Sequence, residues 1–244
     1  LKDFHVNRVF VEGALVAEEG KYLPEIKKCD ISSVKGSVIV KDFSKEKFKM
    51  NLKSNKVNVI KILPGGVVTA KDTAEIELDA NGEFVRNPEV DLVKVAVVER
   101  HQGTGNVACG FLKGYGIKEG AVALSVAHDS HNIIVVGVND EEMEFAVNSL
   151  IEQEGGIVLV KEGKVIESMP MPIAGLMSDQ SGEWVDQKLT DIHEKAYEEL
   201  GICGDVEPVM TLCFMSLAVI PEIKLTDMGL FDVTTFSFIP VEVE

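Results

Sequence analysis

The chain has 244 residues, of which 45% are hydrophobic and 26% charged, and a net charge of −16. This composition is typical of a soluble globular protein with one large or two small domains. The excess of acid argues against a nucleic-acid partner and against anionic membrane surfaces, because both require clustered Lys and Arg. No apolar run approaches the roughly 20 residues that a membrane-spanning helix needs, and no signal peptide is recognisable.

The four cysteines form no CxxC pair and no zinc-like spacing. Scattered cysteines of this kind indicate reduced thiols, so we expect a cytoplasmic protein. The first residues resemble the middle of a protein rather than its start, and we expect a piece of a longer chain.

The N-terminal part predicts a β-hairpin over residues 6–19, with strands at 9–11 and 14–17 around Glu12 and Gly13. Residues 25–56 are charged and weakly patterned, which indicates a surface connection between two domains. Its lysine run, residues 41–56, is typical of a solvated face, and an anion site is the alternative.

Strands are predicted at residues 57–63, 67–70, 74–78 and 92–99, the last nearly continuous in apolar residues and interrupted by an exposed Lys94. A glycine-rich loop then begins with Arg100 and His101. Gly103 and Gly105 superficially match a dinucleotide fingerprint, but the glycines that follow leave no amphipathic helix, so that reading is disfavoured.

The central stretch places five polar residues between two buried strands, residues 121–127 and 133–138. These are His128, Asp129, Ser130, His131 and Asn132. Hydrogen-bonding chemistry at the edge of an apolar core favours a functional site, because desolvation there tunes pKa values. The alternative is a polar turn whose side chains satisfy the loop backbone.

The remaining pattern predicts a helix capped by Asn139 or Asp140 and ended by Gly155, a hairpin over 157–169, and a second helix over 181–200. Residues 169–179 form an apolar, proline-containing irregular loop that must cover something. His193 is expected at the solvated surface. Residues 208–219 fit helix or strand equally, 220–230 a loop, and 234–238 a strand. The fold class is α+β, a mixed sheet with flanking helices.

Three chemistries compete for the central stretch. A metal site needs three or four ligands, and His128 and His131 with Asp129 or Asp179 would supply at most three. Nucleophilic catalysis by Ser130 lacks the glycine elbow. A recognition loop fits better, because Asn amides, imidazoles and carboxylates pair with the edges of heterocycles.

Five separated segments resemble the C-terminal portion of bacterial adenine deaminase, of the amidohydrolase superfamily. They are residues 100–106, 125–137, 139–143, 171–179 and 221–227, in the family's order. Residues 6–20 are similar to the closing hairpin of the small β-sandwich that flanks an amidohydrolase barrel. The resemblance implies domains at 1–55, a β-sandwich remnant with its connection, and at 56–244, the deaminase C-terminal domain.

The resemblance implies hydrolysis of adenine to hypoxanthine and ammonia in purine salvage by the full-length enzyme, which is expected to be a homo-oligomer. It also implies a pair of Mn or Fe ions in a (β/α)₈ barrel with an HxH motif. This chain has no HxH and no room for a barrel of about 250 residues. We therefore expect no metal on this chain and no activity of the chain alone.

The candidate substrate-facing or supporting residues are Arg100, His101, His128, Asp129, Ser130, His131 and Asn132, and weaker candidates are Asp179, Lys224 and Asp227. The expected role is to cover the active site of the barrel. The alternatives are a structural or oligomerisation module without substrate contact, and an independent hydrolase.

Overall fold

The computed structural model describes residues 3–243 and separates two compact units, one ending at Ser33 and the other beginning at Val34. The smaller unit is an antiparallel sheet of β1 (Arg8–Val11), β2 (Ala14–Glu18) and β3 (Lys21–Tyr22). The predicted hairpin is therefore confirmed, and β3 is an addition. Gly13 in its turn has φ of 82°, a conformation that glycine adopts without strain.

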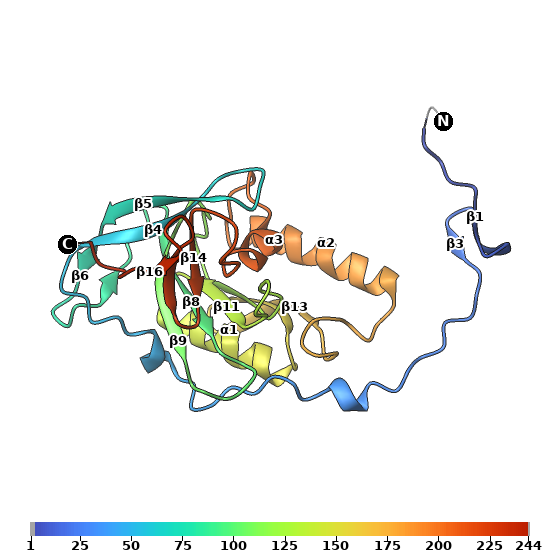
Figure 1. The fold of residues 1–244 in the computed structure, drawn as a ribbon, viewed down its shortest axis with the longest axis horizontal. Coiled ribbons are helices and arrows are strands. Elements are labelled where there is room, and N and C mark those ends of the chain that lie inside the picture. Colours follow the sequence, from blue (N-terminus) through green and yellow to red (C-terminus); the bar gives the residue numbers. More distant parts are fainter. Residues whose placement is uncertain (1–2, 244) are drawn as a thin grey trace. The chain divides into compact units, whose positions relative to one another are not determined.

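The larger unit is built on one eight-stranded sheet, in the order β13-β12-β10-β11-β8-β9-β4-β5 (Figure 1). Its strands are β4 (Lys56–Ile62), β5 (Thr69–Glu75), β8 (Leu92–Val98), β9 (Val107–Lys113), β10 (Ala121–Leu124), β11 (Ile133–Gly137), β12 (Gly156–Lys161) and β13 (Lys164–Pro170). Only the β4–β9 pair is parallel among these neighbours. The predicted α+β class with a mixed sheet is confirmed.

Helices pack on both faces of this sheet. One face carries α1 (Asp140–Glu152) and the 3₁₀ turn Lys45–Phe48, and the other carries α2 (Gly182–Glu198) and α3 (Pro208–Cys213). Alternate residues of β8 enter the two cores, Ala96 one and Val95 the other, because side chains alternate across a strand. The prediction that this strand is buried on both faces is confirmed.

The helices begin where the sequence places caps. The Asn139 side chain accepts a hydrogen bond from the Glu142 N–H at 2.8 Å, and Ser181 accepts one from Trp184 at 3.3 Å. The ambiguous residues 208–219 start as α3, with Pro208 at its first position, where its missing N–H costs nothing. His193, expected at the solvated surface, is partly exposed there and contacts the Glu207 carboxylate, which links α2 to α3.

Three predicted segments differ. Residues 67–70 and 74–78 are mostly one strand, β5, whose polar residues alternate outward at the sheet edge; β6 (Glu77–Leu78) pairs instead with β7 (Phe84–Val85). The expected loop 220–230 is a hairpin, β14 (Ile223–Thr226) with β15 (Gly229–Asp232), followed by β16 (Ser237–Phe238). The glycine-rich region after Asn106 is β9, and Leu225 and Leu230 pack over its Gly110.

Lys94 was predicted to be exposed, but it is buried, with a relative exposure of 6%. Its Nζ lies 2.7 Å from an Asp140 carboxylate oxygen and 3.0 Å from the Phe48 carbonyl oxygen. A buried ammonium requires such partners, because an isolated charge in the core loses its hydration. The partner is the first residue of α1, where a carboxylate also interacts favourably with the helix dipole.

Residues 25–55 contain only two short 3₁₀ turns, Ser32–Val34 and Lys45–Phe48. Within the larger unit Phe48 is fully buried, so part of the expected connection contributes to the core. The predicted domains, 1–55 and 56–244, refer to a longer protein and stay a prediction. No helix among residues 3–243 is long and apolar enough to cross a membrane.

Candidate functional site

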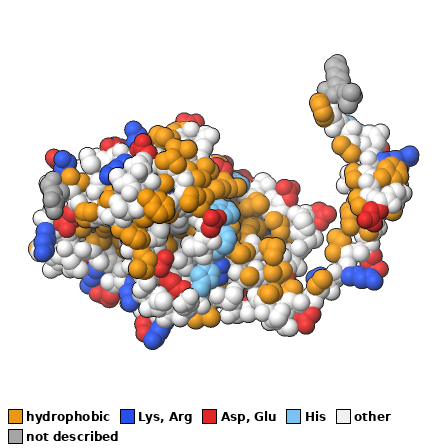
Figure 2. Space-filling model, viewed as in Figure 1, with side chains coloured by type: hydrophobic (Ala, Val, Ile, Leu, Met, Phe, Trp, Pro, Cys, Tyr) orange, Lys and Arg blue, Asp and Glu red, His pale blue; other side chains and the backbone are white. Residues whose placement is uncertain are grey.

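The loop that joins β10 to β11 carries the predicted polar cluster, residues 128–132, here called the histidine loop. The ring centroids of His128 and His131 lie 5.3 Å apart, and His128 also packs on Phe214 at 4.9 Å. Both imidazoles are half-buried, whereas Asp129 and Ser130 are exposed. Figure 2 shows histidines gathered at one place on this face of the larger unit, with apolar side chains on both sides.

Arg100 lies under the histidine loop, at the end of β8, and is 1% exposed. Its Nε donates a hydrogen bond to the His131 carbonyl oxygen at 2.5 Å, and one Nη donates to the Ala174 carbonyl oxygen at 3.1 Å. Burial lowers the pKa of this guanidinium. No carboxylate forms an ion pair with it within residues 3–243. Arg100 therefore fixes two loops against each other.

Ala174, which accepts the hydrogen bond from Arg100, lies in the irregular loop 171–179. The sequence predicts that this loop covers another part of the molecule or a partner. Ser125 donates from its hydroxyl to the Gly175 carbonyl oxygen at 2.5 Å and accepts from the Gly156 N–H at 2.7 Å. A Cβ on Gly175, where φ is 71°, would lie 2.7 Å from an Arg100 nitrogen. The loop thus closes over the buried guanidinium, and only glycine allows this approach.

Three further candidates join the same cluster. A His101 ring nitrogen lies 2.7 Å from the Ser130 carbonyl oxygen. The Asn132 side chain, 4% exposed, accepts from the Arg100 backbone N–H at 3.3 Å and donates to an Asp227 carboxylate oxygen at 3.1 Å. The structure therefore brings together all seven principal candidates, and adds Asp227 from the loop between β14 and β15.

Sequence reasoning missed Glu99, which organises the loop after β8. Its carboxylate accepts from the backbone N–H groups of His101, Gln102 and Thr104 at 2.5, 2.8 and 2.9 Å, and from the Thr104 hydroxyl at 3.0 Å. Desolvation raises its pKa, but these donors outweigh it and the pKa falls to about 2. An acidic residue at a strand end before a glycine-rich loop was the available signal.

His131 has φ of 53°, in the left-handed region that side chains other than glycine seldom adopt. Arg100 holds the carbonyl of this residue, which stabilises that conformation. Burial lowers the pKa of the His131 imidazole, and the nearby His128 and Arg100 lower it further. The ring is thereby favoured in its neutral form, which both donates and accepts hydrogen bonds.

Two weaker candidates lie apart from these contacts. Asp179 is 3.9 Å from Lys35 in an ion pair. Lys224 is fully buried on β14, where its Nζ donates to the Val67 carbonyl oxygen at 2.9 Å. Burial lowers the pKa of Lys224 to about 8. Neither has a hydrogen bond to the histidine loop in the described part of the chain.

The two alternative chemistries gain no geometric support. Among the described residues, no group of three or more His, Cys, Asp or Glu side chains is arranged to hold a metal ion. The residues present thus do not fit the metal pair that the resemblance implies. His101, the imidazole in contact with Ser130, reaches its carbonyl oxygen rather than its hydroxyl, so it is not placed as a base for that hydroxyl.

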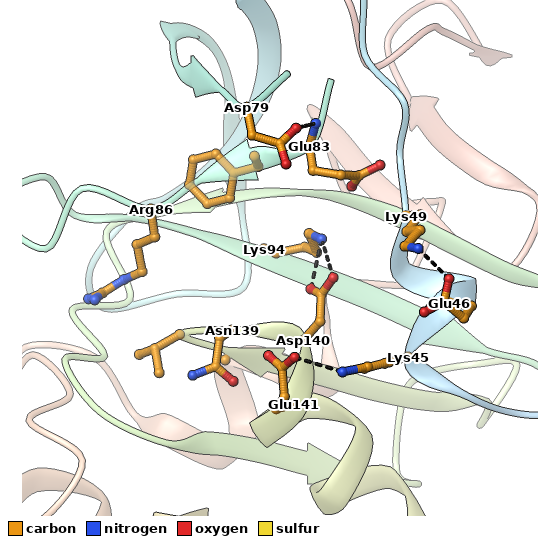
Figure 3. Close-up of a pocket in the computed structure, with 13 residues that line it drawn as sticks. Lys45, Glu46, Lys49, Asp79, Glu83, Arg86, Lys94, Asn139, Asp140 and Glu141 are labelled. Atoms are coloured by element: carbon orange, nitrogen blue, oxygen red, sulfur yellow. Dashed lines mark hydrogen bonds and ion pairs between the residues drawn. The ribbon is translucent and has the colours of Figure 1, made fainter. Parts of the chain in front are cut away.

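A second polar region surrounds the start of α1, a pocket of about 500 Å³ here called the charged pocket (Figure 3). It includes lysines from the run that could have formed an anion site. Lys45 pairs with Glu141 at 2.9 Å and Lys49 pairs with Glu46. Because carboxylates already neutralise these lysines and Lys94, the pocket does not favour an anion.

Comparison with known proteins shows the family of the chain. The family model "Adenine deaminase C-terminal domain" matches residues 66–237. "Adenine deaminase 2" of Desulfotalea psychrophila is 65% identical over 99% of this chain, and "Adenine deaminase" of Ligilactobacillus salivarius is 46% identical over all of it. The chain spans 42% of the length of each of these curated relatives. The chain belongs to the adenine deaminase C-terminal domain family.

Proposed function

We propose that this chain is the C-terminal part of an adenine deaminase that hydrolyses adenine to hypoxanthine and ammonia in cytoplasmic purine salvage. Its proposed role is to cover the active site of a metal-binding barrel formed by the rest of a longer, homo-oligomeric protein. The family match over residues 66–237 carries the proposal, together with relatives named for this activity.

The histidine loop supports the covering role through the way it is held. Arg100 holds its backbone through the hydrogen bond from Nε to the His131 carbonyl oxygen, 2.5 Å long. The imidazole, carboxylate and hydroxyl side chains of the loop lie half-buried or exposed. A recognition site needs polar groups that are held in place before the ligand arrives. The loop meets that need without supplying a complete catalytic set of its own.

The proposal places the Mn or Fe pair on residues outside this chain, since the donors here do not fit it. When bound, such a metal pair supplies an activated water for attack on the amino-bearing carbon of adenine. The residues of this chain would contact the base, orient it and limit the entry of other water. We therefore expect the 244-residue chain alone to release no ammonia from adenine.

The test is an ammonia-release assay on the full-length protein and on the 244-residue chain, each with added Mn²⁺ and with a metal analysis. The proposal predicts turnover by the first and none by the second. His131→Asn in the full-length protein, which keeps a residue tolerant of the left-handed backbone, should reduce kcat/KM for adenine at least tenfold. Unchanged kinetics would remove the histidine loop from the active site.

A structural or oligomerisation module is the competing role, and hydrogen exchange separates the two. With a purine analogue bound to the full-length protein, substrate contact predicts slower amide exchange in residues 127–133. A module that only assembles subunits predicts no ligand-dependent change there. Turnover by the 244-residue chain with Mn²⁺ would instead indicate an independent hydrolase.

A further inference from the structure

We infer that Asp227 is the residue on this chain that distinguishes an amino-purine from an oxo-purine, and that Asn132 positions it. This inference rests on the proposed function and deepens it. Asp227 lies outside the histidine loop, between β14 and β15, and its one hydrogen bond to that loop within residues 3–243 comes from the side chain of Asn132.

Asn132 is suited to positioning because both ends of its amide are engaged. Its Oδ1 accepts from the Arg100 backbone N–H at 3.3 Å, which leaves its Nδ2 directed at Asp227 Oδ1, 3.1 Å away. The residue is 4% exposed, so it cannot contact a ligand without rearrangement. A buried amide with fixed donors and acceptors holds the neighbouring carboxylate in one orientation.

Asp227 differs from Asn132 in being half-buried, with one carboxylate oxygen not engaged by any hydrogen bond within residues 3–243. An ionised carboxylate only accepts hydrogen bonds. The free oxygen therefore favours a ligand group that carries N–H donors and disfavours a carbonyl oxygen, which brings a second acceptor against it.

Adenine and its deamination product differ in this respect. Adenine presents an amino donor beside ring-nitrogen acceptors, whereas hypoxanthine has a carbonyl oxygen in place of the amino group. We place the Asp227 carboxylate opposite the amino group of adenine, which would donate a hydrogen bond to the free oxygen. The carbonyl oxygen of hypoxanthine at that position would meet the carboxylate as a second acceptor, so the site would hold the substrate and release the product.

The experiment compares ligands that differ only at this position, using the full-length protein with Asp227→Asn. We expect kcat/KM for adenine to fall about 10- to 100-fold, the range for losing one hydrogen bond to a charged group. The inhibition constant of purine, which lacks the amino group, should change less than twofold, and hypoxanthine should inhibit more strongly. Asn132→Ala should give a smaller loss with the same ligand pattern.

Asp205→Asn is the matched control, because it removes an exposed carboxylate on another loop and should change none of these constants. Equal losses for adenine and purine would mean that Asp227 has only a structural role, and no change with adenine would also overturn the inference. If the unsubstituted protein neither deaminates adenine nor binds purine, the proposed function itself fails, and that result is seen before any variant is made.

Discussion

The histidine loop with its support and the charged pocket are both polar regions beside the same sheet, but their side chains have different partners. In the charged pocket lysines contact carboxylates, as Lys45 contacts Glu141 and Lys94 contacts Asp140. Under the histidine loop, Arg100 and Glu99 contact backbone groups of loops. Charged side chains that pair with each other have little charge left to bind a ligand. Charged side chains that bond to the backbone of a loop leave the polar side chains of that loop available to a ligand.

The largest expected effect tests the support of the histidine loop. Arg100→Met keeps an unbranched stem like the aliphatic part of arginine but removes the donors to the buried carbonyls of His131 and Ala174. Leaving buried carbonyls unpaired is costly, so we expect the free energy of unfolding to fall by about 3 kcal/mol. Urea unfolding measures the loss, and hydrogen exchange should show faster opening of residues 128–132 and 173–176.

An unchanged urea midpoint for Arg100→Met would mean that the contacts under the loop contribute nothing. Arg8→Met is the control, since Arg8 forms an exposed pair with Glu18 in the smaller unit and should leave the urea midpoint of the larger unit unchanged.

The next effect tests the charged pocket. Asp140→Asn removes the carboxylate that neutralises Lys94, while Asn can still accept one hydrogen bond. Breaking a buried pair leaves an uncompensated charge, so we expect a loss of about 2 kcal/mol in urea unfolding, less than for a fully enclosed pair because Asp140 is partly exposed. Lys45→Ala, at an exposed pair of the same pocket, should leave the midpoint unchanged.

The third effect is a pH dependence of the stabilisation by Glu99, in the region of the histidine loop. The pKa of Glu99 is lowered to about 2 in the folded protein, below its ordinary value of 4.5. A lowered carboxyl pKa means that its stabilisation is present above pH 4.5 and is lost as the pH falls toward 2. Glu99→Gln should therefore unfold about 2 kcal/mol more easily at pH 7 and differ little from the parent near pH 2. A difference that stays constant with pH would contradict this account.

These residues also show what the sequence can predict. The histidine loop, both long helices and the β1–β2 and β12–β13 hairpins follow from local signals, namely apolar runs, caps and turn residues, which depend on neighbours along the chain. The β14–β15 hairpin and β9 depend on each other across more than a hundred residues, as Leu225 packs on Gly110. Read alone, each of these segments resembles a loop.

The candidate site follows the same rule. Its exposed members, His101, Asp129 and Ser130, lie in two polar loops that could be predicted from composition. The roles of Arg100 and Asn132 could not be predicted. The guanidinium bonds to two carbonyls and the amide bonds to Asp227, and these contacts form only because distant loops come together in the fold. The burial of Lys94 was missed for the same reason, since its partner is 46 residues away.

The smallest expected effect at pH 7 concerns one of two buried lysines. Lys94 has a carboxylate partner, whereas Lys224 bonds only to the Val67 carbonyl within the described residues. Burial lowers the pKa of Lys224 from 10.5 to about 8. Because the unfolded chain binds this proton more tightly, stability should rise as the pH increases from 8 to 10.5. Lys224→Met should remove that rise.

At pH 7 the Lys224→Met substitution should change the free energy of unfolding by about 1 kcal/mol or less, since relief of the buried charge offsets the lost hydrogen bond. Urea unfolding of both proteins at pH 7 and pH 10 measures this. If the stabilities of the parent and of Lys224→Met changed with pH in parallel, burial would not lower the pKa of Lys224, and the prediction would be wrong.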